Sequence, residues 1–545
     1  MVQGLAYFVL ILAGLARAAA LAWPTTAWVP PTLQYGEPSW LLSAVGFCLA
    51  FIGLRITLPS SGSWWHLWVR ATVLVSVTLL ATWHWVTYSM HVFGGLPLLA
   101  AWAAAAALAV FLALQSGLML AFAAKGMQGR SAGVSALIFA AGWLLHEWVL
   151  TSWWSGFPWG ESAMPWLSVA GHWPSWLGSG VAGALLAGLF AWLVSVWMQP
   201  RTTIWRRGMP VLLLVLLVWP FGHLQSLDFT QAGKKTSVAL LQTQVRQDVK
   251  FDEQAGLKPL LSWVAQSLRA IDAEVVVWPE TAIPLMSNDP RVALLHAQAV
   301  SRMPSHQAWV VGLPVTQPKT QHDEGVALST HPSHGSDGAP YFNAVQWWHV
   351  GQVSPQHAPG YAKAHLVPFG EFVPFGFRWF VDAMNIPMSD FSSGGLTQAP
   401  IEWAGQRWAS TICYEDLFGV ELARRMGTTS NLPTVWLNHS NLAWFGPGVA
   451  PYQHAQIARW RAAELGRPML RSTNTGMTAV IDHQGRVLDQ LEPQARAVLV
   501  SSVQGRTGMT PYVRWVNWPW VWEGLLAASA LLVLVAWADR MQRLK

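Results

Sequence analysis

Three side chains that can do acid–base or nucleophilic chemistry stand at the ends of short apolar runs typical of buried strands. Glu280 follows such a run and a proline, so its carboxylate is expected at the rim of a sheet, where it can act as a base. Lys363 is the only lysine between Lys319 and Lys545, and a cation in a water-poor site can stabilise an oxyanion. Cys413 ends a strand at the expected start of a helix, whose N-terminus favours the nucleophilic thiolate and whose backbone N–H groups can hold an oxyanion.

Each of these residues also has a plain structural interpretation. Glu280 can be a solvated loop carboxylate, and Lys363 can form a surface ion pair with Glu371 that contributes little free energy. Cys413 can be a buried and inert packing residue, as many free cysteines are. Only their joint occurrence, in the order Glu, Lys, Cys, favours a catalytic site.

The segment that carries the three residues, 236–510, reads as a layered α/β domain. Its 40 charges, 19 basic and 21 acidic, are ordinary for a water-exposed domain, and short strand-like runs alternate in it with helical patterns. A stretch rich in Pro, Ser, His, Gly and Asp at 317–340 is typical of a long surface insertion. The expected strands are 236–245, 274–279, 307–313, 343–350, 407–413 and 434–439, with a hairpin of 478–483 and 486–491, and the clearest helices are 254–270 and 453–466.

The flanking segments, 1–235 and 511–545, are far more apolar. They hold only 14 and 6 charges, in a chain of 545 residues that is 53% hydrophobic and has 37 tryptophans. Apolar stretches near 20 residues long match a hydrocarbon core of about 30 Å, and tryptophan is enriched at membrane interfaces. We therefore expect about eight membrane spans, near 4–23, 39–58, 68–90, 96–124, 131–150, 176–198, 208–227 and 519–538.

Basic residues predict the orientation of these spans. They gather in alternate loops and after the last span, while the other loops carry glutamates and no Lys or Arg. By the positive-inside rule the basic loops face the cytoplasm, so both termini are expected inside and 236–510 outside. Arg17, within the first span, is the one charge that fits this scheme badly. The basic loops contain Arg55, Arg70, Lys125, Arg130, Arg201, Arg206 and Arg207.

The Glu, Lys, Cys order resembles the nitrilase superfamily, whose members share an αββα sandwich and a Glu-Lys-Cys triad. Such a domain between seven helices and one helix resembles the apolipoprotein N-acyltransferase family, which completes bacterial lipoprotein maturation. The resemblance covers nearly the whole chain. Further local matches are FGGLP at 93–97, GFPW at 156–159, AWFG at 443–446, LRSTNTG at 470–476 and TGMTPY at 507–512.

The resemblance implies the fold class and the domains. We expect a polytopic α-helical membrane bundle of about eight spans with an inserted α/β nitrilase-like αββα sandwich domain. Its parts are a membrane domain at 1–235 with about seven helices, an extracytoplasmic catalytic domain at 236–510, and a last span with a cytoplasmic tail at 511–545. The expected location is the bacterial inner membrane, with the catalytic domain on the periplasmic side.

The resemblance also implies roles for single residues. Glu280 becomes the general base, Lys363 the cation that stabilises the oxyanion, and Cys413 the nucleophile. The supporting residues expected around them are Glu371, Tyr414, Glu415 and Asn343, and the residues expected at the substrate or in a lid are Phe251, Phe369, Trp444 and Phe445. Two positions depart from the family pattern: Phe251 replaces a frequent tryptophan, and Leu442 replaces a frequent aspartate, so no role of that acid is transferred.

The expected reaction moves an acyl chain from a phospholipid, through a thioester on Cys413, to the N-terminal amine of a diacylglyceryl-cysteine. No metal, cofactor or nucleic-acid partner is expected, since the histidines of 1–235 show no metal-ligand spacing and the positive charge excess lies in the apolar flanks. The lipid bilayer is an expected partner, and a monomer is expected. The alternatives are a membrane-anchored amidase or nitrilase with a soluble substrate, a transporter with an outer binding domain, and a non-catalytic lipoprotein-binding protein.

Overall fold

The computed structural model describes residues 2–27, 33–56, 64–199, 208–213, 228–250, 258–316, 340–379, 390–427 and 431–543. The chain divides into two compact units. The first unit consists of Met1–Thr87, Leu96–Asp228 and Arg514–Lys545, and the second of Tyr88–Gly95 and Phe229–Val513. The expected surface insertion at 317–340 lies outside the described residues except for its last residue.

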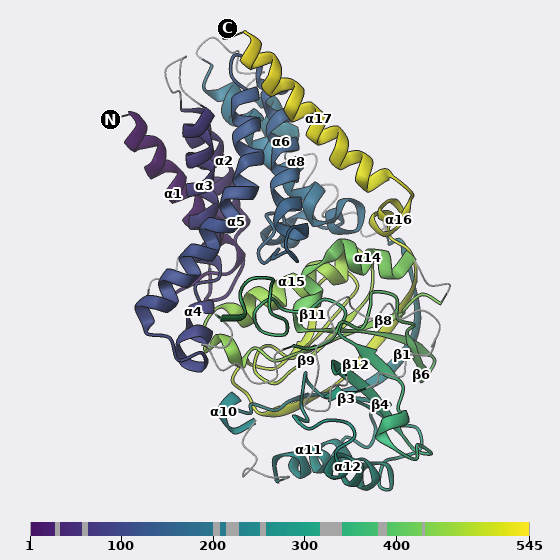
Figure 1. Cartoon of the computed structure of the whole chain (residues 1–545). Helices are drawn as coiled ribbons and strands as arrows, with labels where there is room; N and C mark the ends of the chain where they lie inside the picture. Colours follow the sequence, from purple (N-terminus) through teal and green to yellow (C-terminus); the bar gives the residue numbers. More distant parts are fainter. Residues whose placement is uncertain are drawn as a thin grey trace. The chain divides into compact units, whose positions relative to one another are not determined.

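The first unit is a bundle of apolar helices (Figure 1). Six of the described helices are long and apolar enough to cross a membrane, and α2 is apolar but shorter. The expected span at 208–227 is described only at 208–213, which is helical, so the number of about eight spans is not confirmed. The helices are α1 (Val2–Leu21), α2 (Trp40–Arg55), α3 (Trp64–Thr82), α4 (Val86–Tyr88), η1 (Ser89–Phe93), α5 (Leu98–Gly126), α6 (Ala132–Ser152), η2 (Met164–Trp166), α7 (Leu167–Ala170), α8 (Trp173–Trp197), α16 (Pro511–Asn517) and α17 (Val521–Gln542). Of these, η1 lies in the second unit, α4 ends in it, and α16 begins in it.

Helix α5 shows how this composition makes a bundle. Its buried stripe repeats alanine every fourth residue from Ala101 to Ala113, and Gly117 lies so close to the backbone of α3 that a Cβ would be 3.1 Å from Thr72 N. Small residues allow such close helix packing. The opposite side carries large exposed apolar residues such as Leu99. A helix that turns bulky apolar side chains outward requires an apolar surrounding, which a bilayer supplies.

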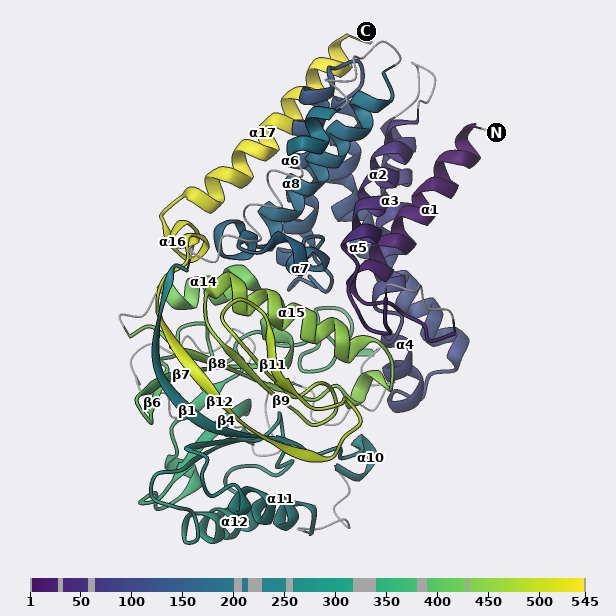
Figure 2. The same ribbon diagram turned by 180° about the vertical axis from the view of Figure 1, so that it is seen from behind.

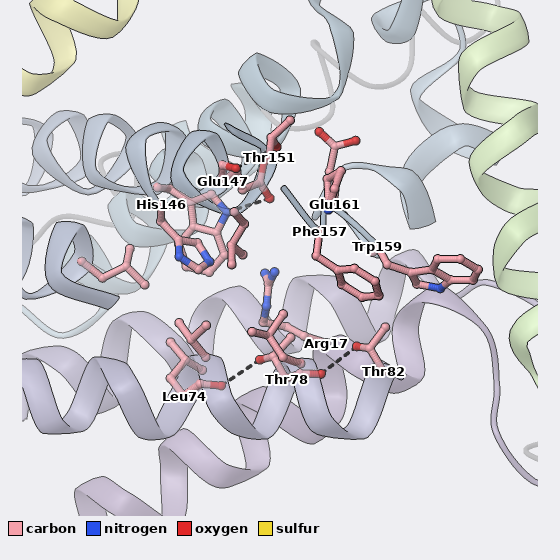
Figure 3. A pocket seen from close by; sticks show the side chains of 17 residues that line it. Arg17, Leu74, Thr78, Thr82, His146, Glu147, Thr151, Phe157, Trp159 and Glu161 are labelled. Atoms are coloured by element: carbon pink, nitrogen blue, oxygen red, sulfur yellow. Dashed lines mark hydrogen bonds between the residues drawn. The ribbon is translucent and has the colours of Figure 1, made fainter. Parts of the chain in front are cut away.

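Arg17, the charge that fits badly in a span, lies inside this bundle. Its guanidinium donates to Ser162 Oγ (2.7 Å) and stands 4.5 Å from the centre of the Trp143 ring. Ser162 in turn donates its backbone N–H to Glu147 (2.9 Å). Figure 3 shows Arg17 pointing into a cavity that His146 and Glu147 also line. The charge is therefore compensated by polar and aromatic groups within the bundle, as intramembrane charges usually are.

The second unit is built on two sheets of six strands each. The first sheet has the order β12-β1-β2-β3-β4-β5 and the second the order β11-β10-β9-β8-β7-β6. The first contains β1 (Thr230–Gln242), β2 (Val275–Val277), β3 (Ala308–Val315), β4 (Phe342–His349), β5 (Gly360–Ala362) and β12 (Ala497–Gly508). The second contains β6 (Ile401–Trp403), β7 (Gln406–Ile412), β8 (Val435–Ser440), β9 (Met469–Thr473), β10 (Ala479–Ile481) and β11 (Val487–Gln490).

Helices cover the outer faces of both sheets, as Figures 1 and 2 show. Apolar residues of α11 and α12 pack on the first sheet, and α15 packs on β9 of the second. A separate apolar core lies between the sheets and includes Val238 and Val275 from one and Leu437 and Leu470 from the other. The unit is thus an αββα sandwich. Its helices are α10 (Gln247–Lys250), α11 (Lys258–Arg269), α12 (Pro290–Val300), η4 (Pro355–His357), η5 (Cys413–Leu417), α14 (Gly419–Gly427), η6 (Ala443–Phe445) and α15 (Ala450–Leu465).

Candidate active site

The two sheets together bring the three sequence-predicted residues to one place. Glu280 follows β2 by three residues and Lys363 follows β5 directly, so both come from the first sheet. Cys413 follows β7 of the second sheet. Lys363 Nζ lies 3.5 Å from Glu280 Oε1, and the charges of both residues act on the Cys413 thiol. The site therefore depends on how the sheets are held against each other.

Lys363 is buried in a cage of acidic and amide groups. Its ammonium, 1% exposed, lies 2.9 and 2.8 Å from the two carboxylate oxygens of Glu371. Asn343 Nδ2 donates to Glu371 (2.7 Å) and to Glu280 (2.9 Å), which links the two carboxylates. Burial by itself would lower the pKa of Lys363, but Glu371, Glu280 and Cys413 together hold it above its ordinary value. The interpretation of Lys363 and Glu371 as a surface ion pair is wrong.

Cys413 stands at a strained turn. Its φ is +51°, a value that residues other than glycine rarely adopt. The five residues Cys413–Leu417 form a 3-10 helix, and the longer helix α14 begins only at Gly419. Cys413 is partly exposed and unpaired in any disulfide. The strained turn therefore places this side chain at the edge of the sheet, packed against the core between the sheets but still partly exposed.

The helix N-terminus that was expected to favour the thiolate of Cys413 does not make it the favoured form. Burial raises the pKa of the thiol, the charge of Glu280 raises it further, and Lys363 lowers it only in part. Two carboxylates, Glu280 and Glu371, face one ammonium, so the surroundings are net negative. No long helix starts at this residue to offset that charge. Cys413 rests as a neutral thiol and needs a base to become a nucleophile.

Glu415 ties the two sheets together beside the site. One carboxylate oxygen accepts from Tyr361 Oη (2.6 Å) and from the backbone N–H of Ala364 (2.8 Å), next to Lys363. The other oxygen accepts the backbone N–H of Ile412 (2.7 Å), next to Cys413. This buried carboxylate thus sets the spacing between the cation and the thiol. Tyr414, also buried, packs its ring against His365 and Phe418 below the turn.

Two residues that the sequence reasoning missed hold Glu280 in place. The backbone N–H of Asn441 donates to Glu280 Oε2 (2.9 Å). His439 Nδ1 donates to the carbonyl oxygen of Trp278 (2.8 Å), two residues before Glu280. His439 lies near the end of β8 in the opposite sheet, and Asn441 directly follows that strand. The available signal was a polar run, Asn438 to Asn441, that ends an otherwise apolar strand.

The expected lid residues lie in two segments of the second unit. Phe369 has a φ of +63° and contacts the ring of Phe377. Trp444 and Phe445 belong to η6 and are half-buried. Ser89 Oγ of η1 donates to the carbonyl oxygen of Trp444, whose ring contacts Phe93. Phe251 lies outside the described residues.

Leu442, where the family pattern often has an acid, is buried against Gly476. An aspartate at this position would lose its hydration, so the apolar residue suits the site as this chain builds it. Among the described residues, no group of three or more His, Cys, Asp and Glu side chains could hold a metal ion. The chemistry that the arrangement offers is nucleophilic: a thiol, a base beside it and a buried cation for an oxyanion.

Two family models match the chain. A model described as carbon–nitrogen hydrolase matches residues 237–512, and one described as apolipoprotein N-acyltransferase N-terminal domain matches residues 25–187. A protein named apolipoprotein N-acyltransferase from Verminephrobacter eiseniae is 37% identical over 98% of this chain and 96% of its own length. Another of that name from Ralstonia nicotianae is 38% identical over 84% of this chain and 82% of its own length. The chain belongs to the apolipoprotein N-acyltransferase family.

Proposed function

We propose that this chain transfers an acyl chain from a phospholipid to the N-terminal α-amine of a diacylglyceryl-cysteine, through a thioester on Cys413. The observation that carries the proposal is the cage of Glu280, Lys363 and Glu371 beside a partly exposed thiol, in a chain that also has apolar, membrane-length helices. Relatives named apolipoprotein N-acyltransferase over almost the full length support the substrates.

In the first half-reaction Cys413 attacks an ester carbonyl of the phospholipid. Because the thiol is neutral at rest, Glu280 takes its proton as the carbon–sulfur bond forms. Lys363, fixed by Glu371, faces the negative charge that develops on the carbonyl oxygen. The carbon–oxygen bond of the ester then breaks, and the leaving lysophospholipid oxygen takes the proton from Glu280. The acyl group remains on sulfur.

In the second half-reaction the free amine of the diacylated acceptor attacks the thioester. Glu280 takes a proton from the attacking nitrogen, Lys363 again faces the oxyanion, and the carbon–sulfur bond breaks. The sulfur takes that proton back from Glu280, which regenerates the thiol. The two substrates therefore use one site in turn, as in a ping-pong reaction.

Both substrates carry acyl chains, which gives the helices a physical role. The bundle holds the chain in the bacterial inner membrane, with both termini in the cytoplasm and the catalytic domain, 236–510, on the periplasmic side, as a monomer. Two exposed aromatic residues in the segment after Glu371, Phe375 and Trp379, suit contact with a lipid interface. The segments around Phe369 and Trp444 are proposed as lids over the acyl chain.

A membrane-anchored amidase with a soluble substrate is not favoured. It would use the same three residues but would leave the membrane helices without a task. The match to the N-terminal domain of apolipoprotein N-acyltransferases, residues 25–187, speaks for the acyltransferase because that region lies outside the carbon–nitrogen hydrolase match.

The proposal is tested with purified protein, a phospholipid with a labelled acyl chain, and a diacylated lipopeptide. We expect the lipopeptide to gain the mass of one labelled chain with the wild-type protein and with Cys48→Ser, since Cys48 lies in α2 of the bundle. Cys413→Ser is expected to give no gain. Transfer to the lipopeptide by Cys413→Ser, or release of free fatty acid with no transfer by the wild type, would refute the proposal.

A further inference from the structure

The peptide bond between Cys413 and Tyr414 is held from one side by two side chains. Its carbonyl oxygen accepts a hydrogen bond from His454 Nε2 (3.2 Å) and a longer one from Asn438 Nδ2 (3.4 Å). His454 comes from α15 and Asn438 from β8, so two separate elements converge on one carbonyl. Neither residue has a part in the acyl transfer described above.

A planar trans peptide places its N–H on the side opposite its carbonyl oxygen. The described peptides include no cis bond, so holding the Cys413 carbonyl also sets the direction of the Tyr414 N–H. The N–H that follows a nucleophile is a natural donor to the oxyanion formed at that nucleophile. The orientation of this peptide plane therefore bears on catalysis, although His454 itself lies behind the turn.

His454 is held in one protonation state. Its Nε2 also donates to Asp416 Oδ1 (2.8 Å), while Arg471 donates to its Nδ1 (2.8 Å). Because Arg471 is always a donor, Nδ1 must carry the lone pair and Nε2 the proton. All three side chains are fully buried, and burial lowers the pKa of His454, with Asp416 opposing and Arg471 adding to that effect. The ring is neutral and always presents its N–H to the carbonyl.

We propose that His454, fixed by Asp416 and Arg471, is a positioning residue that orients the Cys413–Tyr414 peptide so that the Tyr414 N–H donates to the oxyanion. The inference rests on the proposed acyl transfer at Cys413. Arg471 also donates to Asp416 Oδ2 (3.1 Å), so the three residues form a closed ring of contacts behind the turn. Such a ring resists the rotation of the peptide that the strained φ of Cys413 would otherwise favour.

The test compares His454→Gln with His454→Asn. The amide of glutamine reaches about as far as Nε2 of histidine and can bond the Cys413 carbonyl, whereas the amide of asparagine reaches only about as far as Nδ1 and can bond only Arg471. In both variants the buried Arg471 keeps Asp416 as a polar partner. We measure Cys413 acylation by p-nitrophenyl butyrate, whose thiolysis passes through an oxyanion and releases p-nitrophenolate as the thioester forms.

We expect His454→Asn to lower the acylation rate constant by about 10- to 100-fold, with the Michaelis constant nearly unchanged, because the lost contact acts only in the transition state. His454→Gln should stay within about fivefold of the wild type. Alkylation of Cys413 by iodoacetamide forms no oxyanion, so its rate should stay the same in both variants. His296→Asn, which changes another buried histidine in α12, should leave both rates unchanged.

Three results would overturn the inference. Alkylation that falls in parallel with acylation would mean that the thiol, and not the oxyanion donor, has changed. Equal acylation by the Gln and Asn variants would mean that contact with the carbonyl is unimportant. A wild-type protein that is alkylated normally but releases no p-nitrophenolate would contradict the assignment of the Tyr414 N–H as a donor to the oxyanion. A wild type that reacts with the aryl ester but not with phospholipid would instead refute the proposed function alone.

Discussion

The Lys363 cluster of the sandwich and the Arg17 cluster of the bundle each combine a cation with carboxylates, and they differ in how completely the carboxylates are paired. In the sandwich, both oxygens of Glu280 and both oxygens of Glu371 accept from fixed donors. In the bundle, Arg17 is held by Ser162 and aromatic rings, while the buried Glu147 Oε2 has no hydrogen-bond partner among the described residues. Both clusters contain charged side chains inside the fold, so the presence of such groups does not by itself indicate catalysis.

The sandwich cluster differs in having a reactive neighbour. Cys413 stands beside it on a strained turn and is partly exposed, whereas no cysteine is among the described residues that line the bundle cavity (Figure 3). A fixed cation and a fixed base are useful where charge develops during a reaction. In the bundle the same types of group serve to pair a charge inside an apolar surrounding. The comparison predicts that matched substitutions in the two clusters have different consequences.

The largest difference is expected for the carboxylates. Glu280→Gln keeps the shape but removes the base, and its single carbonyl oxygen can accept from only one of the two donors, Asn343 Nδ2 and the Asn441 N–H, so acyl transfer should fall by about 1,000-fold. Glu147→Gln, the matched change in the bundle, should leave the turnover number within about fivefold of the wild type. The measurement is steady-state transfer to the diacylated lipopeptide, normalised to folded protein. Similar losses in both variants would contradict the division of roles between the clusters.

A somewhat smaller loss is expected for the cation of the sandwich. Lys363→Met leaves Glu280 and Glu371 facing each other without an ammonium and removes the group that faces the oxyanion. We expect the rate of thioester formation to fall by about 100-fold or more. Single-turnover acylation with labelled phospholipid measures this step. An unchanged acylation rate would show that Lys363 has only a structural role.

The pH dependence of Cys413 alkylation tests the electrostatics without any acyl substrate. Because burial and then Glu280 raise the pKa of the thiol above its ordinary 9.0, the alkylation rate of the wild type should still be rising at pH 9. Lys363→Met should move this profile to higher pH, since it removes a cation that stabilises the thiolate. Glu280→Gln should move it to lower pH. A wild-type alkylation rate that reaches a plateau near neutral pH would instead show that Cys413 is already a thiolate there.

The smallest effect on turnover is expected for Arg17→Met. The variant lacks the half-buried guanidinium and its contacts with Ser162 and Trp143, and this loss should destabilise the protein by about 1–3 kcal/mol. Turnover per folded molecule should stay nearly the same. Thermal unfolding in detergent measures the stability, and an activity assay normalised to folded protein measures the turnover. A loss of turnover without a loss of stability would give the bundle cluster a direct part in the reaction.

Much of the sandwich can be predicted from the sequence, because its central strands are continuous apolar runs. The strands found around 236–242, 275–277, 308–313, 343–349, 407–412 and 435–439 coincide with the expected ones. Four strands were missed: the short strands β5 and β6, the central strand β9 and the long edge strand β12. Three residues carry little pattern, β9 contains the polar residues Arg471, Ser472 and Thr473, and β12 alternates weakly. The helix expected at 453–466 is found as α15, and it is buried on nearly every side, including Arg461 and Glu464, which pair with each other.

The site itself was predictable only in part. Glu280, Lys363 and Cys413 are visible as unusual residues after apolar runs, because each stands where a strand ends. The groups that orient them, such as Asn441, lie in the opposite sheet and up to 161 positions away in sequence. Contacts of that range depend on the way the sheets pack, which no local pattern encodes. The neutral state of the thiol likewise follows from the balance of buried charges, which requires the structure.

The central claim, a thioester on Cys413, is tested most directly by intact-protein mass spectrometry after incubation with phospholipid alone. Without an acceptor amine the reaction should stop after its first half. We expect the wild-type protein to gain the mass of one acyl chain, to lose it on addition of the diacylated lipopeptide, and to give a peptide modified at Cys413. No mass gain on the wild type, or an equal gain on Cys413→Ser, would contradict the claim.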